Sequence, residues 1–193
     1  SDCAINLSPR KDNVFSSIHR VLKPGGEFYI SDIVADRRLP ASIRNDKKLH
    51  AECLGGALYE YDLLDTITAA GFRDPRSVSR SLVEENIGGT PNRFYSMTLR
   101  GFKFETPLDR RCEDFCQNAT YLGNCPGSEI NFFLDQNHLF EKNTARAICR
   151  NTARMLAETR LSKYFEVTDE LEHRGIFDCS SPTPSPGESP GCC

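Results

Sequence analysis

The chain has 193 residues, of which 38% are hydrophobic and 26% charged, a composition typical of a soluble globular protein. Its formal net charge of -3 gives no support for nucleic acid or an anionic membrane surface as the main partner. No apolar run approaches the roughly 20 residues that a membrane-spanning helix needs. The chain begins SDCAINL, without Met and without a secretion signal, so we expect a chain cut inside a domain.

The first third of the chain has the pattern of an α/β protein. Residues 1–7 read as a short apolar strand, and Ser8-Pro9 then predicts the start of a helix, because Ser is a favoured N-cap and Pro fits the first turn. Pro24-Gly25-Gly26 ends that helix, and residues 27–34 read as a buried strand. A helical crossover between two strands predicts parallel pairing in an α/β sheet.

Two strands and two helices are expected in the next segment. A short helix follows Pro40, and an amphipathic helix extends from Tyr61 to Ala70. Residues 76–83 and 93–104 are rich in β-forming residues, and the turn-rich loop between them predicts an antiparallel pair at the edge of the sheet.

The composition changes after residue 105. Residues 106–179 contain new β-rich and helical segments, including a helix from Thr152 to Leu161, and predict a small α+β domain. Residues 180–193 are rich in Pro and almost free of apolar side chains, so we expect a disordered tail. This tail ends in Cys192-Cys193.

The chain has 9 cysteines, a high and odd number. A secreted disulfide-rich protein is one interpretation. The absence of a secretion signal and the scattering of the cysteines among helix and strand patterns favour unpaired thiols in a reducing compartment, which for this chain is the cytoplasm.

Several motifs resemble one enzyme family. The run HRVLKPGGEFYISD, residues 19–32, resembles the fifth-strand region of class I S-adenosylmethionine-dependent methyltransferases. Read with SDCAINLSPRK at residues 1–11, SDIVADRRLP at residues 31–40 and AECLGGALY at residues 51–59, it resembles arsenite methyltransferase. The later runs RFYSMTLRGFK, CEDFCQNATYLG and CRNTARML are similar to the C-terminal part of that family.

The resemblance implies strands four to seven of a doubly wound methyltransferase sheet, formed by residues 1–105, followed by the family's small C-terminal domain. It implies an enzyme that moves methyl groups from S-adenosylmethionine to thiolate-bound trivalent arsenic, for detoxification, with glutathione or thioredoxin as a thiol reductant and a monomer as the functional unit. The chain contains no GxGxG loop for the methyl donor. We therefore expect the chain to be inactive alone.

Cys53 is the most specific candidate site residue. Trivalent arsenic is soft and prefers thiolates, and the resemblance places Cys53 among the family's arsenic ligands. Gly55 and Gly56 are interpreted as a tight turn that lets a large ligand approach. The alternative is a buried cysteine that acts as a small hydrophobe.

The other candidate residues are less specific. The family's upstream arsenic cysteines lie before residue 1, and the stretch where many members have a further cysteine holds Asn92 and Met97 here. Cys112 is the nearest substitute as a second arsenic thiol. The resemblance places Asp2, Cys3 and Asn6 on or just after the fourth strand and implies that they contact the methyl donor. Asp32 is expected at the end of a parallel strand, as a functional group or as a cap of the next turn.

Three alternatives stay open. Cys112, Cys116 and Cys125 could form a zinc site with His138, although their spacing matches no common zinc motif. The chain could belong to another class I methyltransferase that acts on a small organic molecule. It could also be a thiol-rich module that binds arsenite or zinc without turnover.

Overall fold

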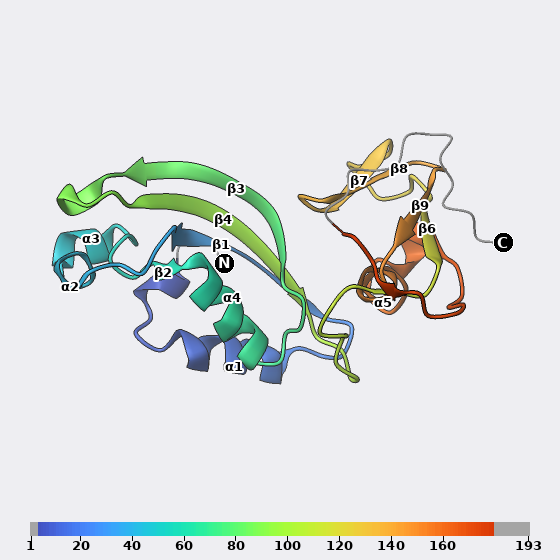
Figure 1. Ribbon diagram of the computed structural model, residues 1–193, viewed down its shortest axis with the longest axis horizontal. Coiled ribbons are helices and arrows are strands. Elements are labelled where there is room, and N and C mark those ends of the chain that lie inside the picture. The colour runs from blue at the N-terminus through green and yellow to red at the C-terminus, as the bar shows by residue number, and fades with distance from the viewer. Residues whose placement is uncertain (1–3, 180–193) are drawn as a thin grey trace. The chain divides into compact units, whose positions relative to one another are not determined.

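The computed structural model describes residues 4–179. The chain divides into two compact units, Ser1–Pro107 (unit 1) and Leu108–Cys193 (unit 2). Figure 1 shows the elements of each unit. Asp2, Cys3 and the predicted tail with Cys192-Cys193 lie outside the described residues. Within residues 4–179, no helix has the length and apolarity to cross a membrane.

Unit 1 is built on a mixed sheet of four strands in the order β2-β1-β4-β3. The strands are β1 (Glu27–Ala35), β2 (Leu58–Tyr59), β3 (Arg76–Glu85) and β4 (Arg93–Phe102). β1 pairs with β2 in parallel and with β4 antiparallel, and β3 pairs antiparallel with β4. The predicted antiparallel pair at the sheet edge is therefore confirmed.

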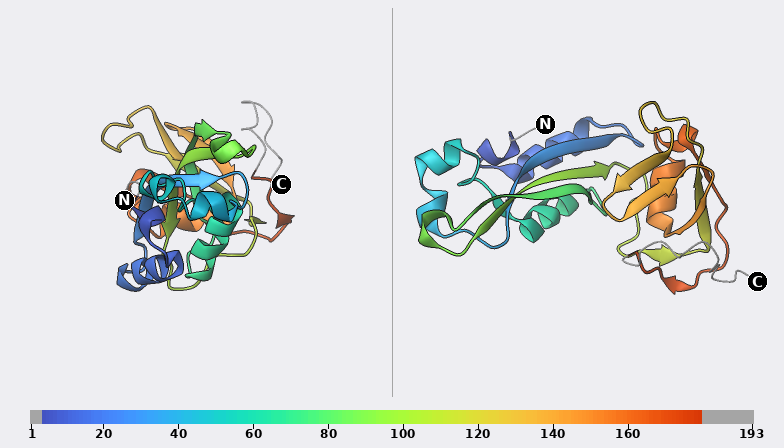
Figure 2. Two further views of the ribbon diagram at one scale, coloured as in Figure 1. Left: turned by 90° about the vertical axis from the view of Figure 1, so that its left-hand side faces the viewer. Right: turned by 90° about the horizontal axis from the view of Figure 1, so that it is seen from above.

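Two helices cover one face of this sheet. Figures 1 and 2 show α1 (Lys11–Val21) and α4 (Glu60–Ala69) side by side against the strands. Their apolar stripes bury Phe15, Leu63 and Ile67, and these meet alternate residues of β1, because successive strand side chains point to opposite faces. The helix-side core contains Ile5, Phe15, Phe28, Ile30, Val34, Leu63, Ile67, Phe72, Met97 and Leu99.

The intervening positions of β1 belong to a second apolar cluster. Ile33 and Ala35 alternate with Val34 and therefore point to the opposite face of the strand. Around them lie the short helices α2 (Ala41–Arg44) and α3 (Lys47–Ala51) and the turn that follows α3. The members of this cluster are Ile33, Ala35, Leu39, Ile43, Cys53, Leu54, Ala57 and Phe94. In this cluster, Cys53 packs against the C-terminal end of β1.

The predicted strand over residues 1–7 is wrong for its described part. Ile5–Leu7 forms a 3-10 helix, and the parallel neighbour of β1 is β2. The Asn6 N–H donates to the Asp32 carboxylate at 3.0 Å. This bond takes the place of a strand hydrogen bond and favours the 3-10 helix over a strand. The predicted cap of α1 is also displaced, because α1 begins at Lys11 with Arg10 as N-cap, while Ser8 Oγ accepts from the Arg10 N–H.

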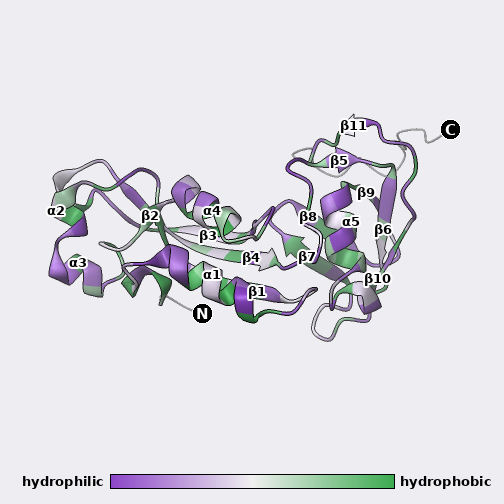
Figure 3. Ribbon diagram, turned by 90° about the horizontal axis from the view of Figure 1, so that it is seen from below, coloured by the Kyte–Doolittle hydropathy of each residue, from purple (hydrophilic) through white to green (hydrophobic). Residues whose placement is uncertain are grey.

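Unit 2 combines short strands with one helix, α5 (Arg150–Ala157), which shows hydrophilic and hydrophobic faces in Figure 3. A three-stranded antiparallel sheet has the order β10-β6-β9, and β7-β8 and β5-β11 form separate antiparallel pairs. Its aromatic core joins Tyr121, Phe132, Phe140 and Phe165. The strands are β5 (Glu113–Asp114), β6 (Gln117–Tyr121), β7 (Asn131–Asp135), β8 (His138–Glu141), β9 (Ala145–Ile148), β10 (Phe165–Val167) and β11 (Gly175–Ile176).

The helix predicted from Thr152 to Leu161 is displaced toward the N-terminus. α5 begins at Arg150 and ends at Ala157. Thr159 Oγ1 donates to the Met155 carbonyl at 2.6 Å and accepts from the Leu161 N–H, so a hydroxyl takes over backbone bonds as the helix ends.

Candidate functional site

Cys53 lies in the turn after α3 with its backbone in the left-handed region, at φ 64°. Its N–H donates to the His50 carbonyl at 3.0 Å. The side chain is 8% exposed and packs with Ile33, Leu54 and Phe94, which is the environment expected of a buried core cysteine. A left-handed conformation costs a residue with a Cβ about 1–2 kcal/mol, so the turn must be held by its neighbours.

Asn6 holds this turn against β1. Its side-chain amide donates to the Ile33 carbonyl at 2.6 Å and to the Cys53 carbonyl at 3.2 Å. Asn6 is 3% exposed, and its backbone N–H donates to Asp32. One buried side chain therefore connects the Cys53 turn with the C-terminal half of β1 through hydrogen bonds.

The two glycines after Cys53 make room for the chain itself. A Cβ on Gly56 would overlap the Asn6 carbonyl oxygen. A Cβ on Gly55 would lie 2.9 Å from the His50 nitrogen and 3.1 Å from the Ile43 carbonyl oxygen. The pair therefore allows the predicted tight turn, because backbone atoms of Asn6, His50 and Ile43 lie where side chains would be. The approach of a large ligand stays a prediction.

Asp32 lies inside β1, which continues to Ala35, so its predicted place at a strand end is wrong. The carboxylate is buried and accepts from the Asn6 N–H at 3.0 Å and the Ile33 N–H at 2.8 Å. Burial raises the pKa of Asp32 above its usual range, although these backbone N–H groups and the charge of Lys11 oppose the shift.

This raised pKa predicts a pH-dependent loss of stability. The folded state binds the Asp32 proton more tightly than the unfolded chain does, so the contribution of Asp32 is fully present below its unfolded pKa and is lost as the pH rises through its folded pKa. We expect the free energy of unfolding of wild type, minus that of Asp32→Asn, to fall over this window and then become constant. Urea unfolding across acid and neutral pH measures the difference, and a rise with pH would contradict it.

Neither residue at the position of the missing family cysteine lies with Cys53 in its apolar cluster. Met97 is buried in the helix-side core. Asn92 is buried in the β3-β4 connection, where its amide donates to the Ile87 carbonyl at 3.0 Å. Cys53 is the only cysteine of residues 4–107.

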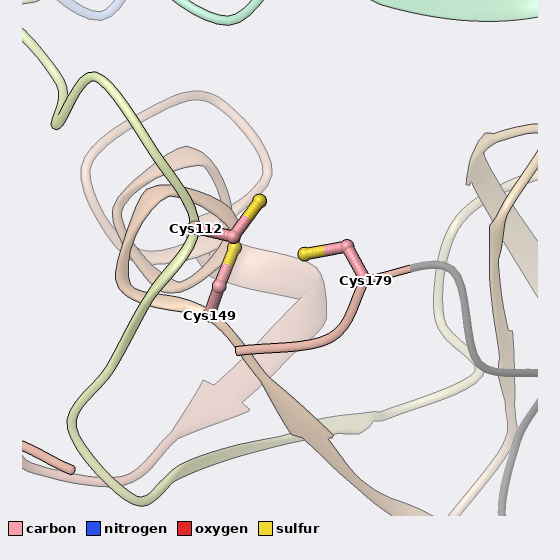
Figure 4. A group of neighbouring side chains, drawn as sticks. All are labelled: Cys112, Cys149 and Cys179. Carbon is pink, nitrogen blue, oxygen red and sulfur yellow. The ribbon is translucent and has the colours of Figure 1, made fainter. Parts of the chain in front are cut away.

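The predicted second thiol, Cys112, lies in unit 2 beside two other cysteines. Its sulfur and those of Cys149 and Cys179 all lie within 4.8 Å of one another, as Figure 4 shows. Sequence spacing did not reveal Cys149 and Cys179 as its neighbours, because three separate segments bring them together.

The structure does not support the alternative of a zinc site formed by Cys112, Cys116, Cys125 and His138. These side chains do not gather into a group that could share an ion. The His138 ring Nδ1 lies 2.7 Å from Asp135 Oδ1 in a buried pair. Cys116 Sγ donates to the Glu172 carbonyl at 3.7 Å.

One of the three predicted contacts to the methyl donor lies in the described part of the chain. Of the predicted contacts Asp2, Cys3 and Asn6, only Asn6 is described. Both hydrogens of its side-chain amide are donated to the Ile33 and Cys53 carbonyls, and its backbone carbonyl accepts from Lys11 Nζ at 3.4 Å. Asn6 therefore contributes by fixing the turn rather than by offering an open hydrogen-bond donor.

Comparison with known proteins places these features in a family. Residues 1–101 match the family model described as a methyltransferase domain. The arsenite methyltransferase of Aquipseudomonas alcaligenes is 44% identical over 186 residues, which cover 92% of this chain and 53% of the relative. The arsenite methyltransferase of Mus musculus is 36% identical over 190 residues, covering 95% of this chain and 47% of the relative.

A solved structure agrees. The crystal structure of an arsenic(III) S-adenosylmethionine methyltransferase from Chlamydomonas reinhardtii has a TM-score of 0.85 and 40% identity, and the match covers 91% of this chain and 60% of that one. The chain spans about half the length of the curated relatives it matches.

These similarities confirm the predicted α/β methyltransferase fold, here with a mixed sheet. The numbering of its strands as four to seven stays a prediction. The chain belongs to the methyltransferase-domain family, and the curated relatives that it matches are arsenite methyltransferases.

Proposed function

We propose that the chain is part of an arsenite methyltransferase that transfers methyl groups from S-adenosylmethionine to thiolate-bound trivalent arsenic. The observation that carries the proposal is the 44% identity to an arsenite methyltransferase across 186 residues, a span that includes most of both units. Residues 1–105 would be part of the catalytic domain and residues 106–179 the small C-terminal domain.

In this proposal Cys53 is a thiolate ligand of the arsenic substrate. A thiolate suits trivalent arsenic because both are soft, and three thiolates leave the lone pair of arsenic free to react. The Asn6 amide, bonded to the Cys53 carbonyl at 3.2 Å, fixes the position of the turn, and position is what a transfer step of this kind demands. S-adenosylmethionine supplies the activated methyl group when bound.

Other parts of the proposal concern ligands and partners. Asp2, Cys3 and Asn6 would lie near the methyl donor, and Cys112 would be a further thiol that binds arsenic. A thiol reductant such as glutathione or thioredoxin would keep the cysteines reduced. The protein would work as a cytoplasmic monomer that detoxifies arsenic.

The test is a chimera in which this chain replaces the matching segment of the Aquipseudomonas alcaligenes relative, whose remaining half supplies the GxGxG loop if it follows the family pattern. With arsenite, S-adenosylmethionine and glutathione, we expect the chimera to form methylated arsenic, measured by chromatography with elemental mass detection. We expect the chain alone to form none. Methylation of a small organic thiol in place of arsenite would favour the other methyltransferase class, and arsenite binding without turnover by the chimera would favour a binding module.

A further inference from the structure

Three segments of unit 2 bring their cysteines to one place. Cys112 precedes β5, and β5 pairs with β11, so that the Phe177 N–H donates to the Cys112 carbonyl at 2.7 Å. Cys179 follows two residues later on the same segment. Cys149 is the N-cap residue of α5, directly after β9. Figure 4 shows the three side chains converging from these segments.

We propose that Cys112, Cys149 and Cys179 form a trithiolate site that binds trivalent arsenic, with no residue in common with the Cys53 turn. The choice of ion rests on the proposed function, whereas the site itself rests on the sulfur positions. All three sulfur atoms lie within 4.8 Å of one another, close enough to contact one ion. Cys149 is buried and the other two are half-buried, so the ion can enter from the side of Cys112 and Cys179.

The number of ligands favours arsenic over zinc. Within residues 4–179, no His, Asp, Glu or further Cys joins this group. A structural zinc ion takes four protein ligands in a tetrahedron. Trivalent arsenic needs only three sulfur atoms, because its lone pair occupies the fourth direction.

The surroundings of the sulfur atoms are already ordered. Cys149 lies at the N-terminus of α5, where the helix dipole favours a thiolate, and its sulfur lies 3.3 Å from Thr152 Oγ1. Arg146 interacts electrostatically with Cys179, and its guanidinium is fixed by hydrogen bonds to the Leu139 carbonyl at 2.6 Å and the Asn137 carbonyl at 2.7 Å.

Hydrogen bonds from Cys179 to Cys112 and Cys149, together with burial, raise the pKa of the Cys179 thiol. Arsenous acid brings three hydroxyl groups: three As–O bonds break, three As–S bonds form, and each thiol proton leaves with a hydroxyl as water. The exchange is balanced and needs no oxidant or reductant.

The test uses the whole chain with Cys3, Cys53, Cys192 and Cys193 changed to Ser, which leaves the trio, Cys116 and Cys125. The probe is sodium arsenite under a phosphine reductant, and native mass spectrometry measures binding. We expect one arsenic per chain, with a mass that corresponds to loss of three protons from the protein. Cys112→Ser, Cys149→Ser or Cys179→Ser should each weaken binding by at least about 10-fold, the lower bound for disturbing even an outer-shell partner of a metal site.

Cys116→Ser and Cys125→Ser are the matched controls, because both cysteines lie in unit 2 outside the trio. Unchanged binding in Cys149→Ser, or loss of binding in the controls, would overturn the site. If a trio variant does not fold, protection of the three cysteines from alkylation by arsenite, mapped on peptides of the parent protein, decides instead. Absence of protection overturns the proposal.

A parallel titration with zinc sulfate separates the two ions. Tight zinc binding that arsenite does not displace would overturn the choice of arsenic. The binding experiment contains no methylation step, so a negative result would not contradict the proposed enzyme activity. In the same way, a chimera that fails to methylate arsenite would not contradict arsenite binding by the three cysteines.

Discussion

Cys53→Ser is expected to reduce arsenite methylation by the chimera by more than 100-fold. A metal site loses about 10- to 100-fold in affinity or activity when only an outer-shell partner is removed, and Cys53 is proposed as a direct ligand. A hydroxyl is a hard, neutral donor at neutral pH and cannot replace a thiolate on trivalent arsenic. The rate of methylarsenical formation at saturating S-adenosylmethionine measures the effect.

Two further variants separate ligation from folding. Cys53→Gly removes the thiol but suits the left-handed backbone at φ 64°, so we expect a free energy of unfolding within about 1 kcal/mol of the parent and the same loss of activity. Cys125→Ser, in a turn of unit 2, should leave the rate unchanged. Methylation by Cys53→Gly at the parent rate would show that Cys53 acts only as a buried hydrophobe.

Gly56→Ala is expected to lower the free energy of unfolding by about 3 kcal/mol, at the upper end of the usual cost of overpacking. Gly56 does not have a positive φ, so the cost comes from the clash of the new Cβ with the Asn6 carbonyl oxygen. That oxygen belongs to the backbone and cannot rotate away. Relief of the clash would shift Asn6 and weaken its hydrogen bonds to Cys53 and Ile33.

Gly89→Ala is the matched control for this prediction. Gly89 has φ 70° and nothing within 4 Å of the position of a Cβ, so only backbone strain of about 1–2 kcal/mol is expected. Urea unfolding of both variants measures the two costs. A smaller effect for Gly56→Ala than for Gly89→Ala would show that the Cys53 turn can move away from Asn6.

The elements predicted correctly depend on local patterns. The stripe of Val14, Phe15 and Ile18 predicts α1, and the glycine-rich stop before Glu27 separates it from β1. The turn between residues 85 and 93 predicts the antiparallel pairing of β3 with β4. In each case the residues that decide the structure are neighbours along the chain.

The features that sequence patterns missed depend on contacts between distant segments. Asn6 ends the predicted first strand because Asp32 and the Cys53 turn offer it hydrogen bonds. Glycine is required at position 56 because the backbone of Asn6 lies where a Cβ would be, a contact that neighbours along the chain do not predict. Cys149 and Cys179 reach Cys112 only through the β5-β11 pair and the start of α5. The number and spacing of the cysteines do not predict that these three lie together.

Methyl transfer to arsenic is measured most directly by the ratio of methylated arsenic to S-adenosylhomocysteine that the chimera forms with arsenite as the only acceptor. We expect one methyl group on arsenic for each S-adenosylhomocysteine, and loss of both products in Cys53→Ser. S-adenosylhomocysteine formed without methylated arsenic, or equal methylation of arsenic by Cys53→Ser, would contradict it.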